Sequence, residues 1–380
     1  MLKCFKTEIQ PTELQKQKIH KTIGVCRFVY NFYLSRNQEL YKETGEFLSA
    51  YDFSKWLNNE FIPNNLDYTW IKEVSSKAIK MSIMNAEKAY KNFFKSKSKF
   101  PKYKKKHKQD VKMPFVKNNK TDLTVERHRI KIPTLGWVRL KEFNYIPIDC
   151  PLRSGTISMR AGRYYVSVLA DVPDKIQLND IDGIGIDLGV KDFATISTGQ
   201  VYKNINKTQT IKTLERRLKH SQRSFSRKLE NKKKGETVYF KNIEKNKLEI
   251  QRLNQRLQNT RKDYINKIVS NLVKTKPAYI TIEDLNIRGM LKNRHLSKAI
   301  QQQNFYYFRQ HLVSKCREYE IEVRLVDRFY PSSKTCHNCG IIKSDLKLSD
   351  RTYICDCGYS NDRDLNAALN LRDAKVYKIA

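Results

Sequence analysis

The chain has 380 residues, of which 39% are hydrophobic, so it can bury one or two sizeable cores and divide into two or three domains. Its 74 lysines and arginines outnumber its 39 acidic residues, which gives a formal net charge of +35. Together with 21 tyrosines and 17 phenylalanines that can stack on bases, this charge favours a nucleic-acid-binding protein over a merely solvated basic surface. Neither a leader-like start nor an apolar run of about 18 residues occurs, so we expect a soluble, cytoplasmic protein without membrane contact.

The first hundred residues have mainly helical patterns. Residues 2–9 alternate like a strand, and Thr12 with Gln15 then forms a capping box that begins a helix. A second long helix is predicted where apolar residues recur on one stripe, at Ile79, Ile83, Ala86, Tyr90 and Phe93.

A basic arm and a group of strands come next. From Lys95 to Lys120 the chain holds eleven lysines and one acid, with prolines that discourage a continuous helix. Residues 110–174 alternate and are rich in β-branched side chains, which predicts a small antiparallel barrel or sheet. Its last two strands are expected to fold back at Ala161–Gly162.

The second half alternates strands with helices, which predicts an α/β core. Residues 182–198 give two strands with a tight turn near Gly189, and residues 277–286 and 322–331 give two more. Between them, two apolar stripes from about Ile211 to Lys274 predict a helical hairpin, interrupted by the polar segment 231–237. A further helix is expected at residues 304–319.

Three acids stand where such a core could gather them. Asp187 and Glu283 each follow the apolar run of a predicted strand, and Asp364 opens the helix DLNAALNL. A buried carboxylate needs a partner and hard oxygen ligands suit Mg²⁺, so the three can converge on one or two ions that hold a scissile phosphate. Each also has an ordinary interpretation: an ATPase phosphate loop at Asp187, a strand-end turn at Glu283 and Asp284, or an N-cap at Asp362 or Asp364.

Four of the eight cysteines crowd together late in the chain. Fifteen residues separate the pair Cys336 and Cys339 from the pair Cys355 and Cys357. This is close to the pattern of a four-thiolate zinc site, with the second pair shortened by one residue. One structural zinc ion is expected, because four protein ligands leave no open position. Substitution by His337, or four unrelated thiols, are the alternatives. The other cysteines are scattered, as buried reduced thiols would be: Cys4, Cys26, Cys150 and Cys316.

These motifs carry a family resemblance. In the order GIGIDLGV, ITIEDLNIRGM, YPSSKTCHNCG and CDCGYSNDRDLNAALNL, the chain closely resembles TnpB, a family of transposon-encoded RNA-guided DNA endonucleases related to type V CRISPR effectors. The resemblance extends over essentially the whole chain and is most specific in the C-terminal half. It implies a multi-domain α/β fold, with an RNase H-like RuvC nuclease core, a zinc-knuckle insertion, and a β wedge domain into which a helical recognition domain is inserted.

The resemblance also implies domain limits and roles. The wedge domain would comprise residues 1–10 and 110–176, the recognition domain 11–109, the nuclease domain 181–331 and 360–373, and the zinc-binding, target-nucleic-acid-binding insertion 332–359. Asp187, Glu283 and Asp364 match the family's catalytic acids, which would hold two Mg²⁺ ions and hydrolyse phosphodiesters. The partners implied are one guide RNA per protein and a double-stranded target DNA with a short adjacent motif.

Candidate contacts to nucleic acid follow from the same resemblance. They lie on the second helix, the basic arm and the helical hairpin: Lys77, Lys80, Phe100, Lys102, Tyr103, Lys104, Lys105, Lys106, Arg216, Arg217, Arg223, Arg227 and Arg261. Three rival functions stay open at this point: a small type V CRISPR effector, an RNA-guided regulator that binds without cutting, and an actin-like ATPase, for which a second glycine-rich phosphate loop is missing.

Overall fold

A computed structural model describes residues 1–106, 112–119, 122–173, 182–230, 241–347 and 350–380. The chain divides into two compact units, Met1–Pro173 and Asp174–Ala380, each with its own cores. Residues 107–111 of the basic arm, the predicted hairpin loop 231–237 and the predicted domain limits near residues 109, 176 and 181 lie outside the described residues. No helix in the described ranges is long and apolar enough to cross a membrane.

A seven-stranded antiparallel sheet organises the first unit. Its strands are β1 (Leu2–Gln10), β2 (Met113–Val116), β3 (Thr124–Val125), β4 (Arg129–Ile132), β5 (Gly136–Leu140), β6 (Leu152–Arg160) and β7 (Arg163–Asp171). They are ordered β2-β6-β7-β1-β5-β4-β3, so the first strand of the chain lies in the middle of the sheet. The predicted reversal at Ala161–Gly162 is confirmed, since both residues have the positive φ, 51° and 74°, that a two-residue hairpin turn favours.

Helices between β1 and β2 form a second core in this unit: α1 (Glu13–Thr44), α2 (Ala50–Trp56), α3 (Ile62–Asn64) and α4 (Ser76–Phe94). Both bonds of the predicted capping box are present, because Gln15 N–H donates to Thr12 Oγ1 and Thr12 N–H donates to Gln15 Oε1. A π-helix at Leu57–Phe61 and a 3₁₀-helix at Leu66–Glu73, which no periodicity predicted, complete this helical group.

A six-stranded mixed sheet organises the second unit. Its strands are β8 (Ile184–Leu188), β9 (Asp192–Ile196), β10 (Val201–Lys203), β11 (Tyr279–Glu283), β12 (Glu322–Val326) and β15 (Lys378–Ile379), ordered β10-β9-β8-β11-β12-β15. The first three strands form an antiparallel meander, while β11 runs parallel to both β8 and β12. This is the arrangement expected for an RNase H-like core.

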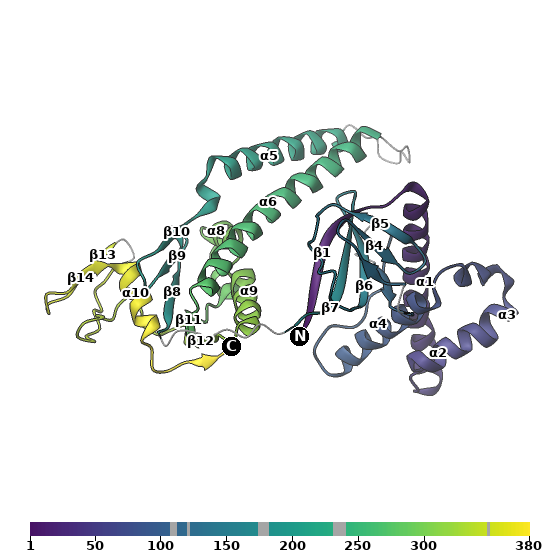
Figure 1. The fold of residues 1–380 in the computed structure, drawn as a ribbon, viewed down its shortest axis with the longest axis horizontal. Helices are drawn as coiled ribbons and strands as arrows, with labels where there is room; N and C mark the ends of the chain where they lie inside the picture. The colour runs from purple at the N-terminus through teal and green to yellow at the C-terminus, as the bar shows by residue number, and fades with distance from the viewer. Residues whose placement is uncertain (107–111, 120–121, 174–181, 231–240, 348–349) are drawn as a thin grey trace. The chain divides into compact units, whose positions relative to one another are not determined.

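Helices cover both faces of this sheet (Figure 1). On one side the sheet packs against α6 (Lys241–Lys274) and α9 (Phe305–Glu318), and the apolar side chains between them form the largest core of the unit. On the other side lies α10 (Arg363–Arg372), against β8. The short helices α7 (Ile287–Met290) and α8 (Ser297–Gln303) precede α9.

The predicted helical hairpin is confirmed. It consists of α5 (Gln209–Glu230) and α6, which lie side by side in Figure 1. A small core of Ile211, Leu214, Leu253 and Leu257 joins the two helices, and the buried Asn246 amide donates to the Ser221 carbonyl. Near the end of α5 the prediction of a buried apolar stripe does not hold, because Leu229 is 45% exposed.

The segment between β12 and α10 carries the cysteines. It contains the two-stranded hairpin of β13 (Thr352–Ile354) and β14 (Ser360–Asp362), and it passes directly into α10. The cysteine segment and the helix with Asp364 are therefore continuous in the structure as well as in the sequence.

Candidate active site and metal site

Strand register places two of the predicted acids side by side. Ile280, Thr281 and Ile282 of β11 pair in parallel with Ile184, Gly185 and Ile186 of β8. The next residue on each strand is Glu283 or Asp187, so both acids sit at the carboxyl ends of neighbouring parallel strands, where strands lie about 4.8 Å apart. The apolar runs GIGI and YITI produce this arrangement, because most of their residues are buried in the core and the acids follow at the edge of it.

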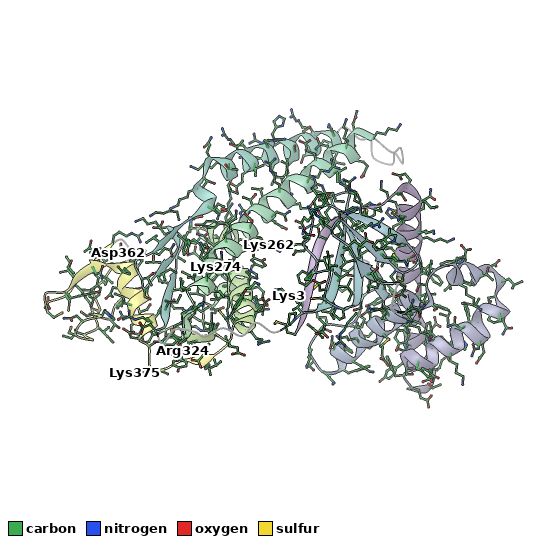
Figure 2. The ribbon with its side chains drawn as sticks, viewed as in Figure 1. Lys3, Lys262, Lys274, Arg324, Asp362 and Lys375 are labelled. Carbon is green, nitrogen blue, oxygen red and sulfur yellow. The ribbon has the colours of Figure 1, made fainter. Side chains whose placement is uncertain are left out.

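Helix α10 brings the third acid. Asp362 is the N-cap, since its Oδ1 accepts hydrogen bonds of 2.9 and 3.1 Å from the N–H groups of Asp364 and Leu365. Figure 2 shows Asp362 at the start of α10, with Lys375 beyond the other end. The ordinary N-cap interpretation therefore holds for Asp362, whereas the carboxylate of Asp364, 24% exposed, belongs to the first helical turn and pairs with Arg363 at 3.2 Å.

A glycine lets this helix approach the sheet. A Cβ built on Gly185 would lie 2.0 Å from the carbonyl oxygen of Ala368 and 2.4 Å from the backbone nitrogen of Arg372. The backbone of α10 thus packs directly on β8, with Ala367 and Ala368 buried. This contact fixes the position of Asp364 relative to Asp187.

The other two carboxylates act electrostatically on Asp187. Burial, and then the negative charges of Glu283 and Asp364, raise the pKa of Asp187 to about 8, against the opposing effect of the Arg363 guanidinium. By surface area Asp187 is only half-buried, so water and ions can reach a carboxyl group that protein otherwise surrounds. Burial also raises the pKa of Glu283, although the Ser332 hydroxyl lowers it in part.

The neighbouring acid Asp284 has a different role. Its carboxylate pairs with Arg309 of α9 at 2.5 Å, and its N–H donates to the carbonyl oxygen of Val326. Asp284 is thus the strand-end residue of the ordinary interpretation, whereas Glu283 turns towards Asp187.

The donor chemistry of the acids suits a hard cation. A carboxylate such as Asp187, whose pKa is raised by burial and by neighbouring negative charges, is relieved when a divalent ion binds beside it. In the described part of the chain, the only group of three or more metal-ligating side chains whose donor atoms all lie within 4.8 Å of one another is the cysteine group. The three acids do not form such a compact group in the described residues.

The four late cysteines form a compact group. The sulfur atoms of Cys336 and Cys357, and those of Cys339 and Cys355, lie 3.6 Å apart, and all four fall within 4.8 Å of one another. This is the spacing of a tetrahedral thiolate site that could bind zinc, despite the shortened second pair. His337 is not a member of the group, because its N–H donates to Asn366 and its ring lies 3.7 Å from Asp373.

Two tight turns shape this thiolate group. Gly340 and Gly358 each follow the second cysteine of a pair and have positive φ, 77° and 84°, which a glycine adopts without strain. The backbone N–H of Tyr359 and the amide of Asn338 lower the pKa of Cys357 to about 6. Of the scattered cysteines, Cys26 and Cys316 are buried as predicted, whereas Cys150 is half-buried and Cys4 is exposed.

Most predicted nucleic-acid contacts are on the surface of their units. The exposed ones are Lys77, Lys80, Phe100, Lys102, Tyr103, Lys105, Lys106, Arg216, Arg217, Arg223 and Arg227. Phe100 remains 45% exposed although it packs edge-on against Tyr90 and Phe93.

Two predicted contacts, Lys104 and Arg261, are half-buried and bind other parts of the protein. Lys104 is half-buried: its N–H and C=O bond the side chain of Asn31, and its Nζ lies 3.8 Å from the centre of the Tyr30 ring. The Arg261 guanidinium is 13% exposed and binds Asn206 and Glu215 at 2.7 and 2.8 Å. Lys104 thus attaches the basic arm to α1. Arg261 of α6 attaches the helical hairpin to the turn before α5, which contains Asn206.

Sequence reasoning missed the polar residues that join the cysteine segment to the acids. Ser332 donates to Glu283, and Asn366 and Asn370 of α10 bind the backbone of residues 332–337. A helix of ten residues with two asparagines on one face, four residues apart, was the available signal.

Family models match three parts of the chain. They are described as a helix-turn-helix domain over residues 1–46, a probable transposase over residues 167–294, and a Cas12f1-like TNB domain over residues 305–371. The last match spans α9 to α10 and thus contains the cysteines and Asp364. Within residues 1–46 the structure has one strand and one continuous helix instead of two helices.

Individual proteins match at greater length. A "Putative RNA-guided DNA endonuclease" of Streptomyces pristinaespiralis is 30% identical over 378 residues, covering 97% of this chain and 88% of that protein. The similarly named InsQ of Escherichia coli K12 is 29% identical over 387 residues, covering 97% and 91%. A CRISPR-associated endodeoxyribonuclease, Cas12f1 of Sulfoacidibacillus thermotolerans, is 28% identical over 234 residues, covering 58% and 52%.

A solved structure supports the fold. The Cas12f1–sgRNA–target DNA complex contains a chain that is 17% identical, with a TM-score of 0.59, covering 95% of this chain and 83% of that one. The multi-domain α/β fold implied by the sequence motifs is thereby confirmed. With a relative 30% identical over 88% of that relative's length, and with these motifs in this order, the chain belongs to the TnpB family of RNA-guided DNA endonucleases.

Proposed function

We propose that this protein uses a guide RNA to select double-stranded DNA and cleaves it by Mg²⁺-dependent hydrolysis at Asp187, Glu283 and Asp364. The observation that carries the proposal is the meeting of three carboxylates at the ends of β8 and β11 and the start of α10, with the pKa of Asp187 raised to about 8. A divalent ion bound among the three carboxylates would offset their repulsion.

Each acid has a proposed task. Asp187 lies between the charges of the other two, so it would bridge two ions, while Glu283 and Asp364 each complete the ligands of one. Bound Mg²⁺ supplies Lewis-acid stabilisation of the phosphate and an activated water. Arg363, whose charge already lowers the pKa of Asp187, would hold the Asp364 carboxylate in place through their 3.2 Å ion pair.

The basic surfaces would hold nucleic acid by its backbone. Base pairing with the guide supplies sequence specificity, so the protein needs phosphate contacts and a site for a short adjacent DNA motif. The exposed lysines around Lys102 and the arginines around Arg227 suit this task, whereas Lys104 and Arg261 support the surfaces from within. One guide RNA per protein is part of the proposal.

The domain roles are proposed as well. Residues 1–10 and 110–176 would act as the wedge domain and 11–109 as the recognition domain, a division that the sheet and the inserted helices of the first unit support. Residues 181–331 and 360–373 would form the RuvC nuclease domain, and residues 332–359 the insertion that binds target nucleic acid.

One structural zinc ion is proposed for the cysteine group. We expect Cys336→Ser to reduce the zinc content from one ion per chain to nearly none and to lower the melting temperature, because the site couples metal binding to folding and Cys336 is 1% exposed. Metal analysis of the purified protein and thermal denaturation are the measurements. Cys4→Ser, which changes an exposed cysteine outside the group, serves as the matched control and should retain zinc.

Magnesium binding should depend on pH. Because the pKa of Asp187 is about 8 in the absence of metal, this acid is mainly protonated at pH 7, and an arriving ion must displace the proton. The apparent Mg²⁺ affinity is expected to fall by up to about tenfold for each pH unit below 8. Calorimetric Mg²⁺ titrations at pH 6.5, 7.5 and 8.5 in two buffers would measure both the affinity and the proton release. An affinity that is unchanged over this range would contradict the assignment of Asp187 as a ligand.

The decisive test of function begins with the bound RNA. RNA that copurifies with the protein is sequenced, and plasmids with or without a sequence complementary to its guide portion are incubated with the complex. We expect cleavage of the matched plasmid only, dependent on Mg²⁺ and abolished by EDTA. Retention of RNA without cleavage of any matched plasmid would instead identify a guided DNA-binding regulator.

A second candidate, a small type V CRISPR effector, is favoured by the TNB match and the structural likeness to Cas12f1. The chemistry at the acids would be the same. Sequenced guides would distinguish the two, because a CRISPR effector carries RNA from a repeat array, whereas a TnpB protein carries RNA from its own transposon end.

A further inference from the structure

A buried serine outside the sheet holds one of the acids. Ser332 is 3% exposed, and its Oγ donates a 2.5 Å hydrogen bond to Oε1 of Glu283. The two residues are 49 positions apart in the chain and belong to different elements. A glutamate side chain has three rotatable bonds, so a fixed donor on one oxygen selects one orientation and leaves the other oxygen for a further ligand.

The serine itself is held in a tight backbone turn. Ser332 N–H donates to the carbonyl of Tyr330, and the N–H and hydroxyl of Thr335 both donate to the carbonyl of Pro331, all at 2.8–2.9 Å. This turn follows β12 and leads into the first cysteine pair. The donor to Glu283 thus lies on the segment that enters the cysteine group.

Helix α10 fastens this turn from the other side. The buried Asn370 amide donates to the carbonyls of Ser332 and Thr335 at 2.8 and 2.7 Å. One turn earlier, the fully buried Asn366 donates to the Thr335 carbonyl and accepts from the N–H of His337. The helix that carries Asp364 therefore also fixes the donor that orients Glu283.

We propose that Ser332 is a positioning residue that sets the side-chain orientation of Glu283 for divalent-ion binding, and that Asn370 keeps Ser332 in place. This inference rests on the proposed nuclease function. Ser332 touches neither substrate nor metal in this role; it acts through Glu283. Partners of this kind typically change metal affinity or activity by about 10–100-fold when they are removed.

The test compares Ser332→Ala and Ser332→Thr with Ser333→Ala. Ser333 is the adjacent, half-buried serine, for which no side-chain hydrogen bond is found among the described residues. Two quantities are measured for each variant: binding of Mn²⁺ by electron paramagnetic resonance, and the Mg²⁺ concentration that gives half-maximal cleavage of a matched plasmid. RNA-guided DNA binding and the melting temperature show whether the fold is intact.

We expect Ser332→Ala to weaken Mn²⁺ binding and to raise the required Mg²⁺ concentration by about 10-fold or more, with guided DNA binding unchanged. Threonine retains the hydroxyl donor, so Ser332→Thr should have nearly wild-type Mn²⁺ binding and Mg²⁺ dependence of cleavage. Ser333→Ala should behave like the wild type. If the Ser332→Ala protein has wild-type Mn²⁺ binding and Mg²⁺ dependence, the inference is wrong. Cleavage of the matched plasmid by the wild-type protein would still support the proposed function in that case. If Ser332→Ala fails to fold, wild-type metal binding by Asn370→Ser would overturn the inference instead. A wild-type protein that never cleaves would refute the proposed function itself.

Discussion

Replacing Asp187 with asparagine is expected to abolish DNA cleavage while leaving RNA-guided DNA binding intact. Asparagine has the same shape but cannot supply the charge that would bridge two metal ions. Since the carboxylate would act mainly on charge that develops in the transition state, its loss should reduce the cleavage rate by about 10²–10³-fold or more. Plasmid cleavage and filter binding of the guided complex measure the two properties separately.

The same substitution should make the metal-free protein more stable at alkaline pH. The pKa of Asp187 is raised to about 8, so between about pH 4 and pH 8 the folded state holds a proton that the unfolded state has released. The stability that this proton confers is complete at low pH and is lost as pH rises through 8. Wild type should therefore lose stability over this range relative to Asp187→Asn, with a difference of about 2–4 °C in melting temperature for each kcal/mol.

Asp263→Asn is a suitable control for both measurements. Asp263 is exposed on α6 and pairs with Lys267, so its loss should alter neither cleavage nor the dependence of stability on pH. Cleavage by Asp187→Asn at the wild-type rate would exclude the proposed centre, whatever the protein's affinity for nucleic acid.

Gly185→Ala is expected to disable the same centre without touching an acid. The added Cβ would meet the backbone of α10 at 2.0 and 2.4 Å, and backbone atoms cannot turn aside as a flexible side chain can. Helix α10 must then move away from β8 and take Asp364 with it. We expect cleavage to be lost, together with at least about 1–3 kcal/mol of stability, as in other overpacked cores.

Gly24→Ala is the matched control for this substitution. Gly24 lies within α1, and a Cβ there meets no atom within 4 Å, so alanine should be neutral or slightly stabilising. Thermal denaturation and the plasmid assay, performed on both variants, separate the close approach from a general effect of removing glycine. Full activity in Gly185→Ala would show that α10 need not pack against β8 as described.

The acids could be predicted because strand ends have a clear sequence signal. The apolar runs before Asp187 and Glu283 mark buried strands, and parallel pairing then brings their carboxyl ends together. Sequence could not decide between Asp362 and Asp364 as the helix cap, since both residue types suit that position. Only the hydrogen bonds of the folded helix assign the cap to Asp362.

The supporting residues could not be predicted in this way. Ser332 and Asn370 lie 38 positions apart, in a turn and a helix, and neither polar residue has a periodic pattern that points to the other. Charge alone was equally uninformative about Lys104 and Arg261, which sit among many similar residues. They differ from the other basic residues because tertiary packing places the Tyr30 ring beside Lys104 and the Glu215 carboxylate beside Arg261.

One ten-residue helix serves three neighbours at once. Ala367 and Ala368 of α10 pack on the sheet, its two asparagines hold the cysteine segment, and Asp364 joins the other acids. These tasks fall on different side chains, so the acid can disappear while the architecture survives. A single substitution of Asp364 could therefore convert such a nuclease into a guided DNA-binding protein that does not cleave. A relative that retains both asparagines but lacks the acid would be an example of this change.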